Sequence, residues 1–381
     1  MIRHSKLAGT GTTIFSVMSK MAEDHGAINL SQGFPDFEGP EVLRERVTWH
    51  MEQGHNQYAP LAGVEGLLEQ ISLKVQDLYG YRADPGTQIV VTPGATEAIY
   101  CAVTAVVHPG DEVIIFDPAY DTYEPCVRLN GGVARRIPLK PPGFGVDWDR
   151  VRDCVNERTR LIMLNTPHNP TGAVWDASDI EALREVIADR DVFLVSDEVY
   201  EHITFDGKPH LSMLRYPDLA ERAFSISSFG KTYHVTGWRV GYCVAPPALM
   251  KEFMRIHQFI NFSAQTPMQY AIADFMQECP GFHRELGGFY QQKRDLFCGL
   301  LENSRFQLIP AEGTYFQLAD YSGISKEPDT EFAARLTREH GVAAIPVSVF
   351  CENSTRQQIV RFCFAKNEET LRQATRRLCT V

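Results

Sequence analysis

The middle of the chain alternates between short apolar runs and longer stretches with helical spacing of apolar residues. The apolar runs are rich in β-branched and aromatic residues and have the length of buried strands. They cover residues 89–92, 113–116, 133–137, 161–165, 193–196, 223–227 and 240–244. Helical spacing covers 97–107 and 176–190, which lie between such runs. This alternation predicts an α/β fold with a mostly parallel sheet and helices on both of its faces.

The last hundred residues follow a different pattern. A long helical stretch at 282–302 precedes three short strand-like runs, and an amphipathic stretch covers 368–378. The strand-like runs are 306–310, 313–318 and 359–364. We expect a second, smaller α+β domain, with the first forty residues packed against it. The predicted division is a large domain at 45–281 and a small domain made of 1–44 together with 282–381.

The charge balance excludes several classes of partner. Lys and Arg number 37 and Asp and Glu number 48, so the formal net charge is −11. Nucleic acids and anionic membranes bind cationic surfaces, so we expect neither as a partner. The most apolar stretch, 98–107, is about half as long as a membrane span. The N-terminus lacks the apolar core of a signal peptide, and these features predict a cytoplasmic protein.

The nine cysteines are scattered along the chain. No two of them have the C-x-x-C spacing of a zinc or redox site, so we expect no metal. A set of this kind predicts buried thiols in a reducing compartment.

A lysine stands in a loop rich in hydroxyl groups and glycine, directly after the run 223–227. The segment reads SSFGKTY and is followed by GWRVG. Lys231 in this setting has the surroundings to form a Schiff base with an aldehyde cofactor. Ser228 and Arg239 offer a hydroxyl group and a planar cation to a phosphate. The alternative is a solvated loop lysine, and this segment alone does not decide between the two.

Asp197 comes at the end of a predicted buried strand, in the segment VSDEVY. A buried carboxylate is costly unless a cation meets it, and a pyridinium nitrogen would be such a cation. Tyr200, three residues later, is placed to donate to the phenolate oxygen of the same ring. A helix N-cap is the alternative role for the carboxylate.

Two further loops follow predicted strands. In PGATEA at 93–98, a glycine turn before a helix directs free backbone N–H groups at a phosphate. In NTPHNPTG at 165–172, two X-Pro steps favour a rigid, extended loop that would hold Asn169 as a hydrogen-bonding residue. We assign His168 a structural role, because a single loop histidine is more often structural than catalytic.

An arginine interrupts the apolar segment IVRFCF. Burying Arg361 unpaired is expensive, and a substrate carboxylate bound bidentately would compensate for it. A structural ion pair is the alternative.

Together these segments resemble the class I/II aminotransferases of fold type I, which depend on pyridoxal 5′-phosphate. The resemblance extends from residue 31 to residue 363, with the motifs in the family's order. It is closest to the branch of methionine aminotransferases and kynurenine/glutamine aminotransferases, on the segments SQGFPDF, NQY, DPAY, NTPHNPTG and RFCF. It implies a large domain with a mostly parallel central sheet between helices, a smaller α+β domain, and a homodimer.

The resemblance also implies a role for each candidate residue. Lys231 would bind the cofactor and then move the substrate α-proton, and Asp197 would pair with the ring nitrogen. The remaining cofactor contacts would be Tyr200 and Asn169 at the ring oxygen, Tyr120 on the ring face, and Ala95, Thr96, Ser228, Arg239 and the neighbouring subunit's Tyr58 at the phosphate. The substrate would meet Arg361, Asn169 and the Gly33 backbone, with Phe15 and Thr96 near its side chain.

The implied reaction moves the amino group of a neutral, bulky amino acid to a 2-oxo acid by a ping-pong mechanism. Methionine, aromatic amino acids, glutamine and kynurenine are the candidate donors, because no second arginine for a side-chain carboxylate is evident. The aromatic candidates for the pocket are Phe15, Tyr58, Tyr120, Phe262 and Phe350, although Phe15 and Phe262 could equally be core residues. The alternatives are a cysteine-conjugate β-lyase and a noncatalytic PLP-binding regulatory protein.

Overall fold

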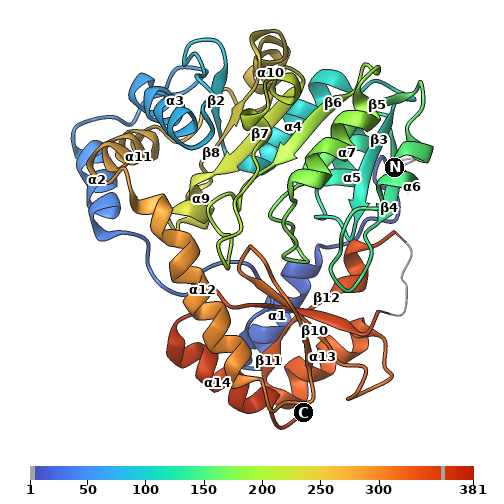
Figure 1. Ribbon diagram of the computed structural model, residues 1–381. Coiled ribbons are helices and arrows are strands. Elements are labelled where there is room, and N and C mark those ends of the chain that lie inside the picture. The colour runs from blue at the N-terminus through green and yellow to red at the C-terminus, as the bar shows by residue number, and fades with distance from the viewer. Residues whose placement is uncertain (1–4, 353–356) are drawn as a thin grey trace.

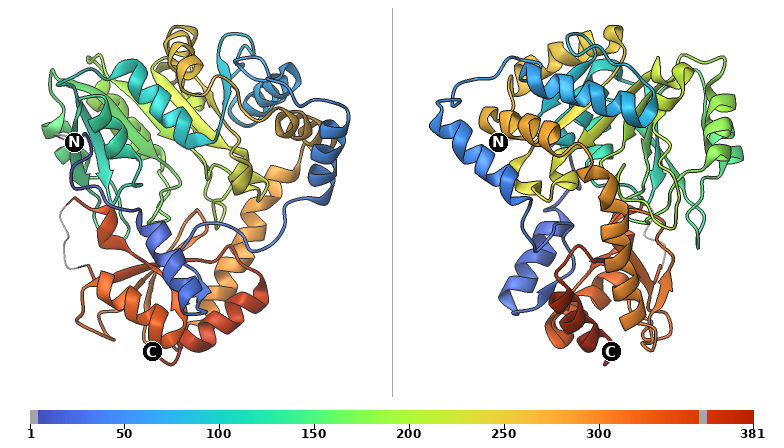
Figure 2. Two further views of the ribbon diagram at one scale, coloured as in Figure 1. Left: turned by 180° about the vertical axis from the view of Figure 1, so that it is seen from behind. Right: turned by 60° about the vertical axis from the view of Figure 1, so that its left-hand side comes forward.

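The computed structural model describes residues 5–352 and 357–381 of the chain. It contains two larger sheets that lie in different halves of the molecule (Figure 1). Helix α12 (Phe282–Leu300) runs from one half into the other (Figure 1). The first helix, α1 (Ile14–Asp24), and the last, α14 (Glu368–Leu378), lie in the half that contains the smaller sheet (Figure 2).

The larger sheet has seven strands in the order β2-β8-β7-β6-β5-β3-β4. β8 runs antiparallel to both of its neighbours, and the other pairs of strands are parallel. All seven predicted runs are strands of this sheet, which confirms the mostly parallel α/β fold. Their bounds are β2 (Ile89–Thr92), β3 (Glu112–Asp117), β4 (Val133–Pro138), β5 (Thr159–Asn165), β6 (Phe193–Asp197), β7 (Ala223–Ser228) and β8 (Gly241–Val244).

Helices cover both faces of this sheet, because the side chains of each strand alternate between two apolar clusters. Val113 and Ile115 point into one cluster and Ile114 into the other. The first cluster also contains residues of α4 (Ala95–Val106), α5 (Tyr123–Leu129) and α10 (Pro247–Ile260). The second contains residues of α6 (Trp148–Cys154), α7 (Ala177–Ile187) and α8 (Pro217–Ala220).

Three helices pack beside the β2–β8 edge of the sheet. They are α2 (Glu41–Glu52), α3 (Glu65–Tyr79) and α11 (Thr266–Glu278). Their apolar faces share one cluster with Val91 of β2 and Tyr242 of β8. Short helical segments lie in the loops: η1 (Met213–Arg215), α9 (Phe229–Thr232), η2 (Thr236–Trp238) and η3 (Val347–Phe350).

The smaller sheet is antiparallel, in the order β12-β13-β10-β9. Its strands are β9 (Gln307–Ile309), β10 (Phe316–Asp320), β12 (Ile345–Pro346) and β13 (Ile359–Cys363), and α13 (Asp329–His340) packs near it. The N-terminal segment joins this part of the chain, since β1 (Ile28–Asn29) pairs with β11 (Val342–Ala343) and α1 contacts α13. The expected packing is therefore seen for residues 14–29, whereas the Ala8 carbonyl accepts a hydrogen bond from Arg128 of α5 in the half that contains the larger sheet.

Several local predictions need correction. The helix expected at 176–190 begins at Ala177, because the Asp176 side chain caps the N–H groups of Ser178 and Asp179. The strand expected at 313–318 begins at Phe316, because Thr314 has a φ of 66°, outside the β region. The prediction of buried thiols is wrong for Cys279 and Cys379, which are exposed, and Cys154, Cys298 and Cys351 are only half-buried.

Across residues 5–352 and 357–381, no helix is both long enough and apolar enough to cross a membrane.

Candidate active site

A cavity of about 400 Å³ lies at the carboxyl ends of the parallel strands. It collects twelve of the thirteen predicted site residues: Phe15, Gly33, Ala95, Thr96, Tyr120, Asn169, Asp197, Tyr200, Ser228, Lys231, Arg239 and Arg361. Tyr58 is the exception; its side chain is 84% exposed and lies outside this cavity.

The reversed direction of β8 explains why loops far apart in sequence meet there. Gly241 at the start of β8 pairs with Thr92 at the end of β2 and with Ser228 at the end of β7. The residues before β8, including Arg239, therefore lie at the same sheet edge as the residues after β2 and β7. Asn165 and Asp197, the last residues of β5 and β6, are direct partners at this edge.

Lys231 is half-buried and forms hydrogen bonds inside the protein. Its Nζ donates to the Tyr315 hydroxyl at 2.9 Å and to the Gly33 carbonyl at 3.4 Å. Burial lowers the pKa of Lys231 to about 8, assisted by the positive charges of Arg239 and Arg361. The solvated loop lysine is therefore excluded, and a neutral amine is available close to neutral pH.

The Asp197 carboxylate is buried and has no cationic hydrogen-bond partner in the described chain. It accepts hydrogen bonds from the Tyr123 hydroxyl at 2.6 Å and from the Val199 backbone N–H at 3.3 Å. Burial raises the pKa of Asp197 to about 6, although these hydrogen bonds oppose the shift. A cation placed beside this carboxylate would lower the cost of its burial.

The N-terminus of α4 lies beside Arg239, and both offer groups that bind anions. Gly94, the N-cap of α4, provides no side-chain hydrogen bond to the first turn, so the N–H groups of Ala95 and Thr96 are free to bind an anion. Glycine is required at 94, because its φ is 80° and an added Cβ would lie 2.7 Å from the Arg239 guanidinium. The Ser228 hydroxyl lies in the same cavity.

Asn169 is held in place by Asn165, which was not among the predicted site residues. The Asn165 side chain accepts from the Asn169 backbone N–H at 2.8 Å and donates to the Asp197 carbonyl at 2.9 Å. His168 lies outside the cavity lining and pairs with the Thr171 hydroxyl at 2.7 Å, which agrees with a structural role. Burial lowers the pKa of His168 to about 4, so this histidine is neutral.

Arg361 is fully buried and its hydrogen-bond partners are uncharged, although the Asp121 carboxylate is close enough for its charge to act on it. Its Nη1 donates to Asn169 Oδ1 at 2.6 Å and its Nη2 to the Ser31 carbonyl at 2.9 Å, while Nε has no partner. Burial lowers the pKa of Arg361 to about 10, so the group remains a cation at neutral pH. The structural ion pair is therefore excluded, and a buried cation is left for an anionic ligand.

Aromatic rings surround the Arg361 guanidinium. Its centre lies 3.8 Å from the Phe316 ring, 5.4 Å from the Phe15 ring and 5.5 Å from the Phe350 ring. Phe15 lines the cavity and also packs against the core cluster, so both expectations for it apply. Phe350 is buried outside the cavity lining, and Phe262 is an exposed residue whose ring packs edge-on against Tyr58.

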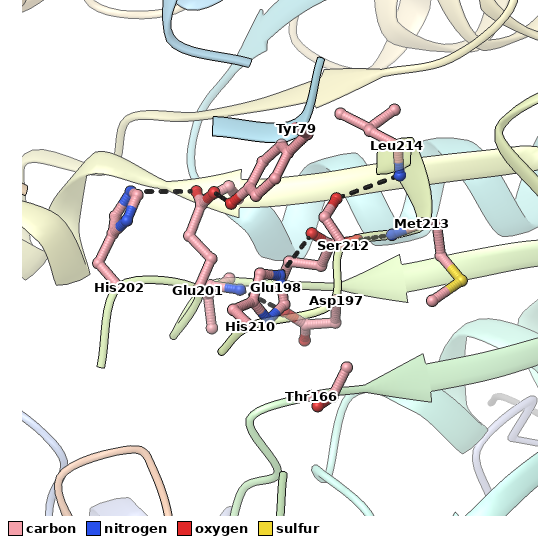
Figure 3. A network of polar contacts seen from close by, with 12 residues as sticks. Tyr79, Thr166, Asp197, Glu198, Glu201, His202, His210, Ser212, Met213 and Leu214 are labelled. Atoms are coloured by element: carbon pink, nitrogen blue, oxygen red, sulfur yellow. Dashed lines mark hydrogen bonds and ion pairs between the residues drawn. The ribbon is translucent and has the colours of Figure 1, made fainter. Parts of the chain in front are cut away.

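A network of buried polar groups follows Asp197 in the chain (Figure 3). Glu198 accepts from His210 Nε2 at 2.8 Å and from the Met213 backbone N–H at 3.1 Å. The Glu201 carboxylate accepts from the hydroxyl groups of Tyr79, Ser227 and Tyr242 and from Lys74. Glu198 directly follows Asp197 and Glu201 directly follows Tyr200, so these contacts hold the backbone next to both residues.

Sequence reasoning missed nine of the residues that line the cavity. Tyr123, Asn165, Gln32 and Phe316 line the cavity beside the predicted residues. Asn165 opens the motif NTPHNPTG, so the motif itself could have indicated it. Gln32 likewise stands in the motif SQGFPDF, whereas Tyr123 and Phe316 stand in segments with no local signal, and folding alone brings these two to the cavity.

One group of side chains near Thr96 has the composition of a metal site, although none was expected. Ligand atoms of Glu97, Cys101 and His257 lie within 4.8 Å of one another. They are, however, hydrogen-bonded among themselves: Glu97 Oε1 pairs with His257 Nδ1 at 2.8 Å and accepts from Cys101 Sγ at 3.1 Å. Such mutual pairing accounts for the group without an ion.

The cavity residues fit pyridoxal 5′-phosphate because they leave polar and charged groups without partners in the protein. The turn at Gly94 leaves space that a Cβ would fill beside Arg239, which suits a phosphate. Asp197 has no cation as a hydrogen-bond partner, and a protonated ring nitrogen would provide one. Lys231 offers an amine of lowered pKa between these two sites.

Comparison with known proteins agrees with this geometry. The family model for aminotransferase class I and II matches residues 25–378. The chain is 53% identical to methionine aminotransferase of Escherichia coli (strain K12) over 99% of this chain and 98% of the relative. It is 33% identical to human kynurenine–oxoglutarate transaminase 3 over 96% of this chain and 87% of the relative.

Solved structures give the same result. A methionine aminotransferase from Escherichia coli superimposes with a TM-score of 0.97 at 52% identity and covers both chains completely. N-succinyldiaminopimelate aminotransferase from Mycobacterium tuberculosis superimposes with a TM-score of 0.96 at 37% identity, over 99% of each chain. The chain therefore belongs to the class I and II aminotransferases, enzymes that use pyridoxal 5′-phosphate to transfer amino groups between amino acids and 2-oxo acids.

Proposed function

We propose that this aminotransferase takes the amino group from a neutral amino acid with a bulky side chain and transfers it to a 2-oxo acid. The observation that carries the proposal is Arg361, a fully buried guanidinium whose Nε lacks a partner and which aromatic rings surround. A planar cation of this kind binds a carboxylate through two parallel hydrogen bonds. We assign it to the substrate α-carboxylate.

Asn169 supports that assignment through its orientation. Its Oδ1 accepts from Arg361, so its Nδ2 is left to donate to the substrate or to the cofactor oxygen. Gly33, Phe15 and Thr96 line the same cavity, and we assign Phe15 and Thr96 to the substrate side chain.

The charges in the cavity favour a neutral substrate side chain. Three cations line it in the described chain, namely Lys231, Arg239 and Arg361. Each has a proposed use, at the cofactor aldehyde, the phosphate and the α-carboxylate respectively. A side-chain carboxylate would have no cation left to neutralise it, and burying it would be costly. The name of the Escherichia coli relative makes methionine the first donor to test.

The cofactor residues follow from the same geometry. We assign the phosphate to Ala95, Thr96, Ser228 and Arg239, the ring nitrogen to Asp197, and the ring face to Tyr120. Tyr200 and Asn169 would donate to the ring oxygen. When bound, pyridoxal phosphate supplies an aldehyde that takes up amines and a ring that withdraws electrons from the substrate Cα.

Lys231 is proposed to move the substrate proton. Because burial lowers its pKa to about 8, a part of the Lys231 population is the neutral amine at neutral pH. That amine would take the proton from Cα of the amino donor in the first half-reaction, and in the second it would deliver a proton to the carbonyl carbon of the acceptor oxo acid, which becomes the Cα of the new amino acid. The two half-reactions share one site. Double-reciprocal plots of initial rate against amino-acid concentration, each at a fixed oxo-acid concentration, should therefore give parallel lines.

A homodimer is part of the proposal. Tyr58 and Phe259 are 84% and 85% exposed, and Phe262 packs on Tyr58. Exposed aromatic residues at such density are typical of an interface. We place Tyr58 at the phosphate of the neighbouring subunit. Light scattering after size-exclusion chromatography should give twice the mass of 42.9 kDa.

We also propose the domain division of 45–281 and of 1–44 with 282–381. The pairing of β1 with β11 and the contact between α1 and α13 support it, because they attach the N-terminal segment to the C-terminal part. Residues 1–4 and 353–356 lie outside the described residues.

An absorption spectrum tests the function. The purified enzyme with pyridoxal phosphate should show a visible band that L-methionine, without any oxo acid, converts to the spectrum of the amine form of the cofactor. L-Aspartate should convert it far more slowly. Release of pyruvate and ammonia from a cysteine conjugate at a higher rate than transamination would instead indicate a β-lyase.

The variant Lys231→Ala gives the matched control for this experiment. It should bind the cofactor without the covalent bond and should show no turnover. Substantial transamination by Lys231→Ala would contradict the role proposed for this lysine.

A further inference from the structure

Tyr315 is fully buried, and its hydroxyl lies beside the reactive nitrogen of the site. Its ring packs against three other rings, with centroid distances of 5.2 Å to Tyr200, 5.6 Å to Tyr290 and 5.0 Å to Phe316. These contacts hold the ring in one position. The hydroxyl is 2.9 Å from Lys231 Nζ.

The direction of the hydrogen bonds at this hydroxyl is determined by its neighbours. The Gly33 carbonyl can only accept, so the Tyr315 hydroxyl donates its single proton to that carbonyl, at 2.7 Å. The oxygen then remains as an acceptor toward Lys231. A neutral Lys231 amine in this position gives one N–H to Tyr315 and keeps its lone pair free.

Gly33 provides independent support for this arrangement. A Cβ on residue 33 would lie 2.5 Å from the Phe316 ring and 3.2 Å from the Tyr315 ring. Glycine at this position therefore lets the backbone come close enough for its carbonyl to hold the Tyr315 hydroxyl. The roles of Gly33 at the substrate and at Tyr315 are separate.

We propose that Tyr315 is a catalytic residue, whose hydroxyl holds the Lys231 amine with its lone pair directed at the carbon it attacks. The proposal rests on the function proposed above for Lys231. It applies whenever Lys231 is a free amine, which includes the covalent attachment of the cofactor and the movement of the proton at the substrate Cα.

The attachment step balances without any further reactant. A bond forms between Nζ and the aldehyde carbon, and the aldehyde oxygen leaves as water with the two hydrogens of the amine. Tyr315 is unchanged by the step. Its contribution is to orient the nucleophile, and the loss of one hydrogen bond corresponds to about a tenfold change in rate.

The test compares Tyr315→Phe with Tyr290→Phe. Both variants remove a hydroxyl from a fully buried ring of the same cluster, but the Tyr290 hydroxyl pairs with His234 at 2.9 Å, away from Lys231. Apoenzyme is mixed with pyridoxal phosphate in a stopped-flow instrument, and the first-order growth of the visible band measures attachment to Lys231. Pyridoxamine phosphate, which has no aldehyde, measures binding alone.

We expect Tyr315→Phe to slow attachment by about tenfold, with the Kd for pyridoxamine phosphate within about twofold of the original. The methionine half-reaction should slow by a similar factor at saturating methionine, with unchanged half-saturation. Tyr290→Phe should leave both rates unchanged, and thermal unfolding should show similar losses of stability in the two variants.

An unchanged attachment rate in Tyr315→Phe would overturn the proposal, as would an equal loss in Tyr290→Phe. Weaker binding of pyridoxamine phosphate that accounts for the whole effect would also overturn it, because Tyr315 would then only shape the cavity. Failure of the proposed function looks different: the unsubstituted enzyme itself would then form no covalent bond at Lys231.

Discussion

The ammonium group of Lys74 lies 2.6 Å from the carboxylate of Glu201, and both side chains are buried. The residues are 127 positions apart in the chain and connect α3 with the segment that follows Asp197 and Tyr200. Burial acts to raise the pKa of Glu201, but the attraction of Lys74 and the hydrogen bonds outweigh it, so this pKa lies well below its usual value. The pair therefore anchors the chain next to Asp197 and Tyr200 to α3.

Removing Lys74 should destabilise the protein strongly. Lys74→Met leaves the Glu201 carboxylate buried without its cation, at a cost of about 3–5 kcal/mol in the free energy of unfolding. The matched control is Lys140→Met, which removes an ion pair with Asp147 whose lysine is 66% exposed and should cost about 0–1 kcal/mol. Urea denaturation measures both. Equal losses in the two variants would show that the buried pair does not support the fold.

The double variant Lys74→Met with Glu201→Gln should recover part of the lost stability. It removes both charges, so no unpaired carboxylate remains in the interior. A double variant less stable than Lys74→Met alone would mean that the hydroxyl groups around Glu201 need its charge.

Replacing Arg361 by lysine should damage catalysis although the charge remains. A lysine has no planar fork, so it loses the paired geometry for a carboxylate together with the bonds to Asn169 and the Ser31 carbonyl. We expect kcat/KM for methionine to fall by about 100-fold to 1000-fold. Arg255→Lys, an exposed substitution on α10, should leave kcat/KM unchanged. Near-normal kcat/KM in Arg361→Lys would remove this residue from the substrate site.

Gly94→Ala should weaken cofactor binding more than it weakens folding. The added Cβ would lie 2.7 Å from the Arg239 guanidinium and displace it from the anion site. Gly110→Ala is the control, because Gly110 also has a positive φ but no atom lies within 4 Å of its added Cβ. Both variants should lose about 1–2 kcal/mol of stability from backbone strain, and a higher Kd for pyridoxamine phosphate is expected in Gly94→Ala alone. Equal Kd values in the two variants would contradict an anion site at Arg239.

The free energy of unfolding of the cofactor-free enzyme should depend on pH through the Asp197 carboxyl. Burial raises the pKa of Asp197 from 3.8 to about 6, so the folded state binds this proton more tightly than the unfolded state. The free energy of unfolding therefore falls as pH rises through this range, by about 3 kcal/mol in total from this group. The free energy of unfolding of the unsubstituted protein minus that of Asp197→Asn should decrease by that amount between about pH 4 and pH 7. A difference independent of pH would mean that the carboxyl titrates normally.

The local pattern of the sequence determined the seven strands of the large sheet and most of the chemistry placed at their ends. Buried parallel strands are nearly continuous apolar runs, and this signal does not depend on distant contacts. Since parallel strands end at one edge of a sheet, the strand pattern alone places Asp197, Ser228 and the loop after Asn165 at that edge. Charged and polar residues that directly follow an apolar run are recognisable from the order of residues alone.

The tertiary structure decided how these groups are paired. The reversal of β8, the contact of Tyr123 with Asp197 and the pair of Lys74 and Glu201 all join segments far apart in the chain. A composition or a periodicity describes one segment at a time and contains no information on which distant segment will face it. Arg361 shows the consequence, since its sequence context allowed either an ion pair or a ligand site, and only the arrangement of its neighbours left the guanidinium without a hydrogen-bonded carboxylate.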